Sequence, residues 1–482
     1  MTDVLIAGAG PTGLLLAAEL ALAGVRVTVL ERRSGPGLPR PVGLQPRTAE
    51  LLELRGLNPA DQQVDGPSGH FAGLPVALDH SVWQTRHPRV LNRTQDDVEA
   101  MLATHALALG AVIERGHEVT AVDVDADGVT IHRSPGVRVA EPPARGEAPN
   151  DTDGLRARWL VACDGAHSTV RRLLGVPFPG RTETSVATLA HIRLAAASAL
   201  VPARAAHFSQ VTRQVGGYWS MLTPLGDGGH RFVFGSTTRQ PGRDAPVSDT
   251  EVTEALTALY GAETQLGEVY GASRFNDATR QLEQYRHGRV LFAGDAAHIH
   301  PPLGGQGLNL GVQDAMNLGW KLAATVRGTA PSGLLDTYHA ERHPAAERVL
   351  RHTAAQRVFT APDRGENVEA LREIVIDLMR LPDANRYFSG LLSGLGLEYP
   401  GARRVPDLDL TTAAGRTRLS ALLHGGRGVL LDLGDHSTPV GFTGQVDHVR
   451  AATADPGYRG RLLLVRPDGY AVDPAELGRW FG

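Results

Sequence analysis

Three short segments of the chain carry residues whose types and spacing suit the binding of a nucleotide. The first is Gly8-Ala9-Gly10-Pro11-Thr12-Gly13, and Glu31 follows 18 residues after its last glycine. Glycines at this spacing permit a tight turn, close approach of backbone to a pyrophosphate, and close packing of a helix on a strand. An acid at that distance accepts hydrogen bonds from ribose hydroxyls. The segment predicts a dinucleotide site, and the motif alone does not separate NAD from FAD.

The second and third segments point to a particular kind of nucleotide. Asp164-Gly165 follows an apolar run, and Gly294-Asp295 precedes Pro302 and a glycine-rich stretch that ends at Asn309. Asp295 suits sugar-like hydroxyls, and the glycines let a flat ring lie against backbone. A helix from Leu308 would direct its positive end at that ring, although a phosphate or a carboxylate would suit the same helix end. The stretch argues against a simple NAD-dependent dehydrogenase.

The elements that must hold these segments are predicted by the apolar pattern. Short apolar runs predict strands that are buried on both faces, and a helix between the first two completes a β-α-β unit. The expected strands are Val4–Ala7, Val25–Leu30, Trp159–Cys163 and Arg289–Ala293, with an antiparallel pair in 119–133. Residues 134–155 are expected to form a polar loop. The expected helices are 14–23, 46–54, 94–109, 308–326, 332–357 and 364–380.

Composition excludes several classes of protein. The chain has 482 residues, of which 42% are hydrophobic and 21% charged, as in soluble globular proteins of about three domains. A net charge of −4 gives no overall basic field for nucleic acid. The lone Cys163 rules out an internal disulfide and a thiolate metal cluster. Without a long apolar run or a basic leader, we expect a cytoplasmic protein with no metal, membrane or nucleic-acid partner.

Taken in this order and spacing, the three segments resemble the single-component FAD-dependent aromatic hydroxylases, the class A flavoprotein monooxygenases. More narrowly, the chain is similar to actinobacterial hydroxylases of aromatic polyketides. The resemblance covers residues 1–355 and extends to the tail, where 403–407 and 463–470 look like that family's C-terminal domain. This domain has no cysteine here, so dithiol chemistry is excluded.

The resemblance implies FAD and assigns residues to it by position. Gly8, Gly10, Gly13 and Glu31 would bind the ADP part, and Pro11, Thr12 and Arg32 are also assigned to the cofactor. Arg40 would lie near the pyrophosphate and ribityl, Gln95 would contact FAD, and Asp164 is implicated in both FAD and NADPH binding. Gln95 follows Thr94, whereas the family often has a Pro-Gln pair. The remaining contacts would come from Gly294, Asp295, Pro302, Gly304, Gly305, Gln306, Gly307, Leu308 and Asn309.

The resemblance also implies a fold and a division into domains. We expect an α/β protein with a Rossmann-like FAD-binding fold, an inserted antiparallel β-sheet substrate domain and a thioredoxin-like C-terminal domain. Residues 1–175 would form the first part of the FAD-binding domain, with a short contribution to the substrate domain near 70–93. The substrate domain would span 176–275, the second FAD-binding part and a helical linker 276–402, and the C-terminal domain 403–482.

The substrate wall is expected in the inserted sheet. The aromatic and apolar residues that suit a slot for a polycyclic ligand are Trp83, Phe208, Tyr218, Trp219, Met221, Phe232 and Phe234. Among these we select Trp219, Met221 and Phe232, and add Arg86 for polar groups of the substrate. Phenol activation requires a base or a hydrogen-bond acceptor. His298 and His300 lie near the predicted flavin site, where a structural role is the alternative, so no catalytic residue is assigned.

The family mechanism implied for this chain has two halves. NADPH or NADH reduces FAD, and oxygen then adds to the flavin at C4a, giving a hydroperoxide that hydroxylates a phenolic polycyclic substrate of the polyketide type. The expected partners are this aromatic substrate and molecular oxygen, with monomer and homodimer both open. Alternatives on the same fold are Baeyer–Villiger oxygen insertion, antibiotic-inactivating hydroxylation, and a non-catalytic ligand binder that retains FAD.

Overall fold

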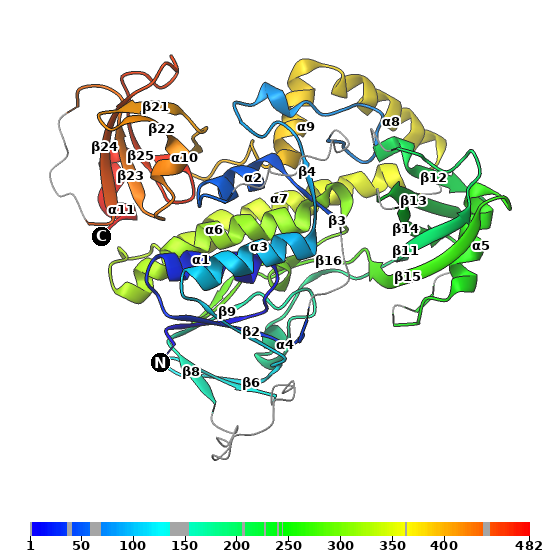
Figure 1. Ribbon diagram of the computed structural model, residues 1–482, viewed down its shortest axis with the longest axis horizontal. Coiled ribbons are helices and arrows are strands. Elements are labelled where there is room, and N and C mark those ends of the chain that lie inside the picture. Colours follow the sequence, from blue (N-terminus) through cyan, green and yellow to red (C-terminus); the bar gives the residue numbers. More distant parts are fainter. Residues whose placement is uncertain are drawn as a thin grey trace.

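The computed structural model describes residues 2–35, 41–57, 69–134, 154–204, 208–225, 228–238, 241–242, 244–361, 364–436 and 444–482. Three bodies lie side by side in Figure 1. A nucleotide-binding domain occupies the middle, a domain built on a β-sheet lies at the right, and the C-terminal domain lies at the left.

A six-stranded sheet of order β17-β18-β9-β1-β2-β5 forms the core of the middle domain. The strands β1 (Val4–Ala7), β2 (Val27–Glu31), β9 (Trp159–Ala162) and β18 (Val290–Phe292) are buried along their whole length. Such runs suit parallel strands that helices cover on both faces. The edges are β5 (Val112–Arg115) and β17 (Arg286–His287). The four strands expected from the apolar runs are therefore present.

Helices α1 (Pro11–Leu22), α3 (Gln95–Ala108) and α6 (Gln306–Arg327) pack as a layer beside this sheet (Figure 1), and α1 contacts both α3 and α6. A capping box between Thr94 and Asp97 fixes the start of α3. Helix α7 (Asp336–Thr360) packs on α6. The other helices of this part are α2 (Pro46–Glu53), α4 (Thr169–Leu173), α8 (Glu366–Met379) and α9 (Pro382–Ser393).

Small sheets surround the middle domain. The expected antiparallel pair is present as β6 (Val119–Val124) and β7 (Val129–Arg133), joined by β8 (Leu155–Ala157). Residues 135–153, most of the predicted polar loop, lie outside the described residues. The strands β3 (Pro41–Leu44) and β4 (Leu91–Thr94) pair with each other. A three-stranded sheet of β10 (Gly180–Arg181), β16 (Thr279–Gln281) and β19 (His298–Ile299) joins the middle domain to the sheet domain.

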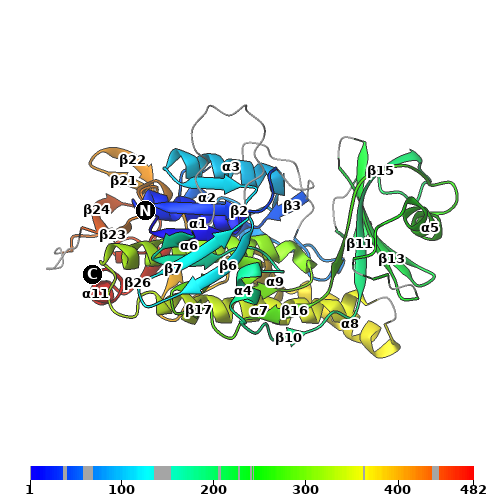
Figure 2. The same cartoon turned by 90° about the horizontal axis from the view of Figure 1, so that it is seen from below.

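The sheet domain is antiparallel, in the order β12-β13-β14-β11-β15. Its strands are β11 (Val186–Ala196), β12 (Thr212–Val215), β13 (Tyr218–Pro224), β14 (Gly229–Ser236) and β15 (Gln265–Asn276). Helix α5 (Asp249–Tyr260) covers one face, and Figure 2 shows it outside the sheet, on the side away from the middle domain. The opposite face is therefore directed toward the nucleotide-binding domain.

The C-terminal domain is a mixed sheet of order β20-β26-β25-β23-β24-β21-β22, with β23 and β24 parallel. Its elements are β20 (Arg403–Arg404), β21 (Asp409–Thr412), β22 (Gly415–Arg418), α10 (Leu419–Leu422), β23 (Gly428–Asp432), β24 (Val446–Ala452), β25 (Leu462–Val465), β26 (Tyr470–Val472) and α11 (Leu477–Trp480). It packs on α6, where the rings of Trp320 and Phe481 stack at 5.7 Å between centroids.

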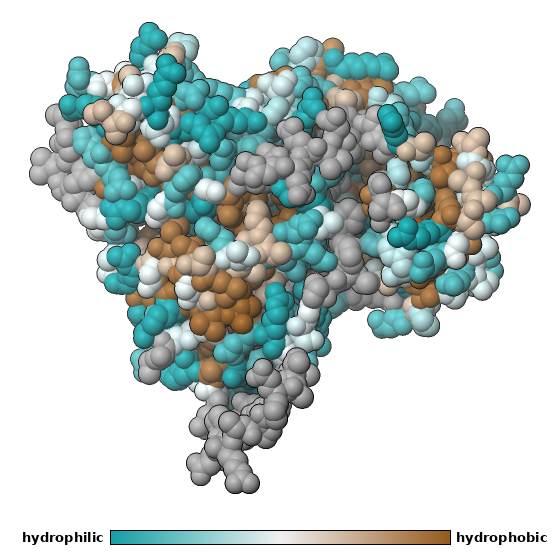
Figure 3. Space-filling model, in the orientation of Figure 1, coloured by the Kyte–Doolittle hydropathy of each residue, from teal (hydrophilic) through white to brown (hydrophobic). Residues whose placement is uncertain are grey.

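In the described part of the chain, no helix combines the length and the apolar composition that a membrane crossing requires. In Figure 3, apolar residues gather in patches over the middle of the molecule, with hydrophilic residues around them.

Candidate active site

The register of the parallel strands brings the predicted segments to one edge of the sheet. Ala7 pairs with Leu30 on one side and with Ala162 on the other, and Phe292 also pairs with Ala162. The residues just beyond these strand ends, among them Gly8, Glu31, Asp164 and Asp295, line one large cavity of about 2380 Å³. Segments that are far apart in the sequence therefore meet at one site.

The three glycines of the first turn have different surroundings. Gly8 has a φ of +102°, and a Cβ there would lie 2.4 Å from the carbonyl oxygen of Cys163. A Cβ on Gly13 would lie 2.0 Å from the carbonyl oxygen of Gly8. At Gly10, by contrast, a Cβ would meet no described atom within 4 Å. Gly8 and Gly13 thus permit the turn and the packing of α1, while the backbone at Gly10 faces open space in the cavity wall.

Glu31 ends β2 with its carboxylate held by backbone. The amide nitrogens of Ala9 and Arg33 each donate a hydrogen bond of 2.9 Å to it. Burial raises the pKa of Glu31, but the two backbone donors and the Arg33 side chain outweigh burial, so the net pKa is lowered. The side chain therefore presents an ionised acceptor at the edge of the cavity.

Asp164 lines the same cavity beside Gly8, and one of its two carboxylate oxygens lacks a hydrogen-bond partner among the described residues. Its Oδ2 accepts a hydrogen bond of 3.0 Å from the amide of Val170, whereas Oδ1 is buried without a hydrogen-bond partner among the described residues. Burial raises the pKa of this carboxyl group. Leaving a buried polar atom unpaired costs roughly 1–3 kcal/mol, so this oxygen is placed for a ligand group or for water.

The third segment forms a glycine-rich wall of the same cavity. Gly304 and Gly305 have φ values of +75° and +63°, and α6 starts at Gln306 without a side-chain cap. The amide groups at this end of α6 are thus available to an electron-rich group. Asn309 holds the wall in place, because its Oδ1 accepts from the amide of Gln45 at 2.8 Å and its Nδ2 donates to the Gly43 carbonyl at 2.8 Å.

The sheet domain supplies the opposite wall through the face that α5 leaves uncovered. Trp219, Met221 and Thr223 of β13 line the cavity, and Trp219 lies against Gly235, where a Cβ would come within 2.7 Å of the indole. Met221 pairs with Val233, which in turn pairs with Leu189, and all three line the cavity. On the loop side, the rings of His70 and Phe208 stack at 4.0 Å between centroids. The space between is lined by aromatic and apolar groups together with polar side chains such as Thr223.

Comparisons with known proteins agree with this arrangement. A family model described as FAD binding domain matches residues 1–353, and one described as aromatic-ring hydroxylase, C-terminal, matches 398–475. The chain belongs to the class A FAD-dependent aromatic hydroxylases. This monooxygenase is 46% identical to the 12-dehydrotetracycline 5-monooxygenase/anhydrotetracycline 6-monooxygenase of Streptomyces rimosus, over 100% of this chain and 99% of the relative.

Two further relatives show how far the similarity extends. The hydroxylase is 39% identical to a rifampicin monooxygenase of Streptomyces venezuelae, over 100% of this chain and 99% of that protein. The solved structure of the anhydrotetracycline hydroxylase OxyS from Streptomyces rimosus superposes with a TM-score of 0.88 and 43% identity, over 100% of this chain and 99% of the other. The fold class and the family expected from the sequence are confirmed.

The residues present fit FAD. The open backbone at Gly10 suits a pyrophosphate, the carboxylate of Glu31 suits ribose hydroxyls, and the buried Oδ1 of Asp164 lacks a partner among the described residues. Most residues expected at the cofactor line the cavity: Gly8, Gly10, Glu31, Arg32, Gln95, Asp164, Asp295, Pro302, Gly304, Gly305, Gln306, Gly307 and Leu308. Gln95 also donates a hydrogen bond of 2.7 Å to Glu99. Arg40 lies outside the described residues.

Five residues assigned to the cofactor do not line the cavity themselves. Pro11, Thr12, Gly13, Gly294 and Asn309 are not among the residues that line it. Thr12 fills the space between two glycines, since a Cβ on Gly294 or Gly311 would come within 2.8 Å or 2.2 Å of its Oγ1. Thr12 therefore has a packing contact in the structure, next to Gly10 of the cavity wall.

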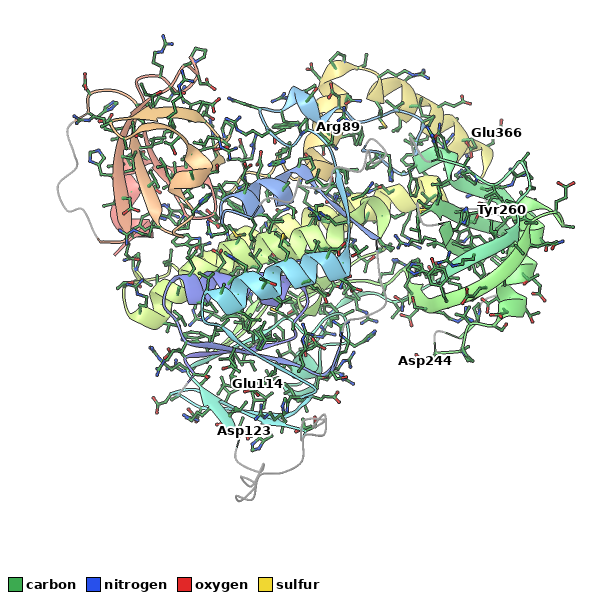
Figure 4. The ribbon with its side chains drawn as sticks, viewed as in Figure 1. Arg89, Glu114, Asp123, Asp244, Tyr260 and Glu366 are labelled. Atoms are coloured by element: carbon green, nitrogen blue, oxygen red, sulfur yellow. The ribbon has the colours of Figure 1, made fainter. Side chains whose placement is uncertain are left out.

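Two residues selected for the substrate wall lie elsewhere. Phe232 is fully buried between the sheet and α5, because side chains alternate along β14 and its neighbour Val233 takes the cavity face. Figure 4 places Tyr260 on the α5 side of the same sheet, where its hydroxyl lies 3.0 Å from Ser220 Oγ. Arg86 instead bonds Asp407 at 2.9 Å and Asp409 at 2.6 Å in the C-terminal domain.

The remaining aromatic candidates divide in the same way. Phe208 lines the cavity, whereas Tyr218 and Phe234 pack on the α5 side of the sheet. Trp83 lies against Gly390 and under the guanidinium of Arg386, away from the cavity. Trp219 and Met221 are the selected wall residues that the structure places in the cavity.

His298 and His300, the two histidines that precede the glycine-rich wall, differ in their surroundings. His298 Nε2 lies 2.7 Å from Asp314 Oδ2, and Asp314 also accepts from Arg342 at 2.7 Å and from the Gly294 amide at 3.0 Å. Sequence reasoning missed Asp314 and Arg342, and an acid within the otherwise uncharged first part of α6 was the available signal. His300 lines the cavity, and burial lowers its pKa to about 4, so its ring is neutral at pH 7.

Proposed function

We propose that this enzyme uses NADPH or NADH and molecular oxygen to hydroxylate a phenolic, polycyclic substrate of the polyketide type. One observation carries the proposal. A single cavity joins the nucleotide turn, the glycine-rich wall before α6 and the apolar face of the inserted sheet. The activities for which two relatives are named, on anhydrotetracycline and on rifampicin, support a large oxygenated aromatic substrate.

The chain's own residues divide the work between cofactor and substrate. Gly10, Glu31, Asp164 and Asp295 would hold the adenosine, pyrophosphate and ribityl parts of FAD, and the wall from Pro302 to Leu308 would hold its ring. When bound, FAD accepts a hydride from the nicotinamide and activates oxygen for transfer to the substrate. Trp219, Met221 and Val233 would orient the aromatic ring system against that wall, because flat apolar contacts fix its plane.

Hydrogen-bond donors at the start of α6 would stabilise negative charge on the ring of the cofactor. This end of the helix has no side-chain cap, so its amide groups have no competing acceptor from a capping side chain. The neutral His300 ring places no full positive charge beside the same wall. The electrostatic contribution of this region is therefore that of backbone dipoles.

Product analysis tests the proposal. Purified FAD-loaded enzyme is incubated with anhydrotetracycline and a panel of polycyclic phenols, with NADPH or NADH and ¹⁸O-labelled oxygen. We expect substrate-dependent oxidation of the nicotinamide and a product that carries one labelled hydroxyl group. A W219A variant should lower kcat/KM by at least tenfold, while Y387A, a change at an exposed tyrosine, should not.

Two outcomes would contradict the proposal. A labelled ring oxygen in a lactone or ester, in place of a hydroxyl group, would indicate Baeyer–Villiger insertion. Tight binding of the phenols without oxidation of NADPH or NADH would indicate a ligand binder that retains FAD.

The similarity to a rifampicin monooxygenase favours a second candidate, the oxidative inactivation of an aromatic antibiotic. The same cavity would serve, because a large oxygenated aromatic molecule is required in both cases. Loss of antibacterial activity after incubation with the enzyme, NADPH and oxygen would favour inactivation, and retained activity of a hydroxylated product would favour biosynthesis.

A further inference from the structure

The cavity face of the inserted sheet is apolar at one level and polar at the next. Strand pairing defines an apolar row across three strands, formed by Met221, Val233 and Leu189. Two residues further along each strand lies a polar row, formed by Thr223, Arg231 and His191. All six residues line the cavity. The change from apolar to polar is therefore a property of the wall that faces a bound substrate.

The polar row lies on the side of the apolar row that is farther from the nucleotide-binding domain. Strand β15 leaves the sheet at Asn276, and β16 follows and pairs with β19 just before Pro301. Asn276 pairs with Val186, at the start of β11. Leu189 is thus close to the point where the sheet domain joins the nucleotide-binding domain. His191 is two residues farther from that point, a distance of roughly 7 Å along the strand at 3.3 Å per residue. Trp219 lies at the other end, four residues before Thr223 and so roughly 13 Å from it.

The residue types of the polar row suit one kind of ligand group. The guanidinium of Arg231 is always charged and presents five N–H donors in a planar fork that matches a carboxylate or a delocalised enolate. Thr223 and His191 flank it on the neighbouring strands, so their polar atoms can contact the same group. His191 is 3% exposed, and its ring lies 5.7 Å from that of Tyr270, which also lines the cavity.

We propose that the polar row, centred on Arg231, anchors an ionised oxygen at the far end of an elongated fused-ring substrate. The anchored group is a carboxylate, an enolate or an acidic phenolate. With that end held, the apolar row and Trp219 cover the middle rings, and the opposite end of the molecule reaches the glycine-rich wall before α6. The oxidised carbon then lies on a ring remote from the anchored oxygen. This inference rests on the proposed function, because it places the aromatic substrate in this cavity.

A matched pair of probes measures the anchor directly. The first is 5-hydroxyanthraquinone-2-carboxylate, which carries its charge and its phenol on opposite end rings, and the second is its methyl ester. Affinity is measured from the absorbance change of bound oxidised FAD, without NADPH. We expect the unmodified enzyme to bind the carboxylate at least tenfold more tightly than the ester. R231Q should bring the two affinities within about threefold of each other, and R231K should retain part of the preference.

Control variants separate a specific anchor from a general effect of charge or folding. R193Q removes an exposed arginine from the same strand as His191 that does not line the cavity, and it should keep the preference for the carboxylate. FAD content and melting temperature show whether R231Q folds. If it does not, T223V tests the same row and should reduce the preference at least threefold. An unmodified enzyme without preference for the carboxylate, or an unchanged preference in R231Q or in T223V, overturns the proposal.

The same experiment distinguishes failure of the anchor from failure of the proposed function. If the carboxylate preference depends on Arg231 but no probe is hydroxylated, the anchor stands and the hydroxylase assignment for such substrates falls. If the carboxylate probe is hydroxylated on the ring that bears the carboxylate, the assay supports the function and overturns the orientation. We expect the new hydroxyl group on the ring that already carries the phenol.

Discussion

Buried polar groups beside the start of helix α6 differ from those around its second half. The first turn of α6, beside Gly305, faces the cavity, where Asp164 Oδ1 and His300 Nε2 lack partners among the described residues, although Asn309 of the helix itself is bonded. Its second half, around Asn317 and Lys321, lies in a buried network in which charged side chains bond one another. The contrast indicates which polar groups the fold requires and which are left for a ligand.

The network on the C-terminal side joins two domains. Lys321, the sole lysine of the chain, donates to Glu341 at 2.7 Å and to Asn317 at 2.8 Å. Arg466 of the C-terminal domain donates to both oxygens of Glu341, at 2.6 and 2.9 Å, and to Asp468. Lys321 and Arg466 are fully buried. Each charge therefore depends on the others, since water does not reach them.

The cavity side shows the reverse. Asp164 Oδ1 and His300 Nε2 are buried and have no hydrogen-bond partner among the described residues. His300 Nδ1 lies 2.8 Å from the Pro301 carbonyl oxygen, which accepts a hydrogen bond from it, so Nε2 is left as an acceptor in the neutral ring. Unpaired buried atoms are costly, so these two atoms beside the cavity suit a ligand group or water. The network should thus control stability, and the cavity side should control binding.

The largest effect is expected when Glu341 is changed. The E341Q substitution leaves Lys321 and Arg466 buried with one carboxylate fewer, and such losses destabilise by roughly 3–5 kcal/mol. The free energy of unfolding, measured by chemical denaturation at pH 7, should fall by about 3 kcal/mol. E347Q, at an exposed position of the same helix, should change it by less than about 0.5 kcal/mol. Equal stability of the two variants would contradict the role of this buried network in stability.

The acid sensitivity of the network is the next effect. Burial raises the pKa of Glu341, but Lys321 and Arg466 outweigh it and lower the pKa from 4.5 to about 2. Between these values the unfolded chain binds the proton more readily than the folded chain, so stability falls as the pH is lowered through this window. Burial also lowers the pKa of Lys321, to about 8, which leaves both groups charged at pH 7.

We therefore expect the stability gap between the unmodified enzyme and E341Q to narrow as the pH falls from 4.5 toward 2. Denaturation midpoints of both proteins across this range measure the gap. A gap that stays constant would show that the charge of Glu341 does not act through this titration.

On the cavity side, Asp295 tests binding without a large effect on the fold. It is exposed in the cavity wall, and D295A should remove contacts with the ribityl part of FAD. The loss of one or two hydrogen bonds to a charged group, at roughly 1.5 kcal/mol, raises the Kd for FAD about tenfold. Equilibrium dialysis of the apoprotein against FAD measures the change. D447N, on the surface of the C-terminal domain, is the control, and equal FAD affinity in D295A would refute the assignment.

Much of this site could be predicted because its residues lie directly after strand ends. The apolar runs before Gly8, Asp164 and Gly294 predict parallel strands, and parallel strands bring the residues at their carboxyl ends to one edge of the sheet. The turn of Gly8 to Gly13 also constrains its own geometry, since a Cβ at either end of it would collide with backbone. Local pattern was sufficient wherever the function of a residue depends on its own element.

Prediction failed where a side chain depends on a distant partner. Phe232 and Met221 are equally apolar, but the pairing of Met221 with Val233 places them on opposite faces of the sheet. Arg86 is a plausible contact for substrate until Asp407 of the C-terminal domain is seen beside it. The same holds for Asp314 and Arg342, which meet from two helices. Strand register and domain packing determine where these side chains lie, and the local sequence does not predict either of them.

The smallest effect on stability is expected at His300. Replacing it by leucine, in H300L, removes an acceptor that has no partner among the described residues and one hydrogen bond to the Pro301 carbonyl. One such bond is worth about 1 kcal/mol, and the apolar side chain no longer buries an unpaired nitrogen, so the two changes offset each other in part. The free energy of unfolding of H300L should thus lie within about 1 kcal/mol of the unmodified value.

A small effect at His300 beside a large one at Glu341 would sharpen the comparison, because both residues are polar and largely buried. Chemical denaturation of the apoprotein at pH 7 measures both variants under one condition. At that pH the ring of His300 is neutral, since burial lowers its pKa to about 4, so no charge is lost on substitution. A loss in H300L as large as that in E341Q would mean that the cavity wall is held by its polar groups as firmly as the network is, and that unpaired atoms there do not mark a binding site.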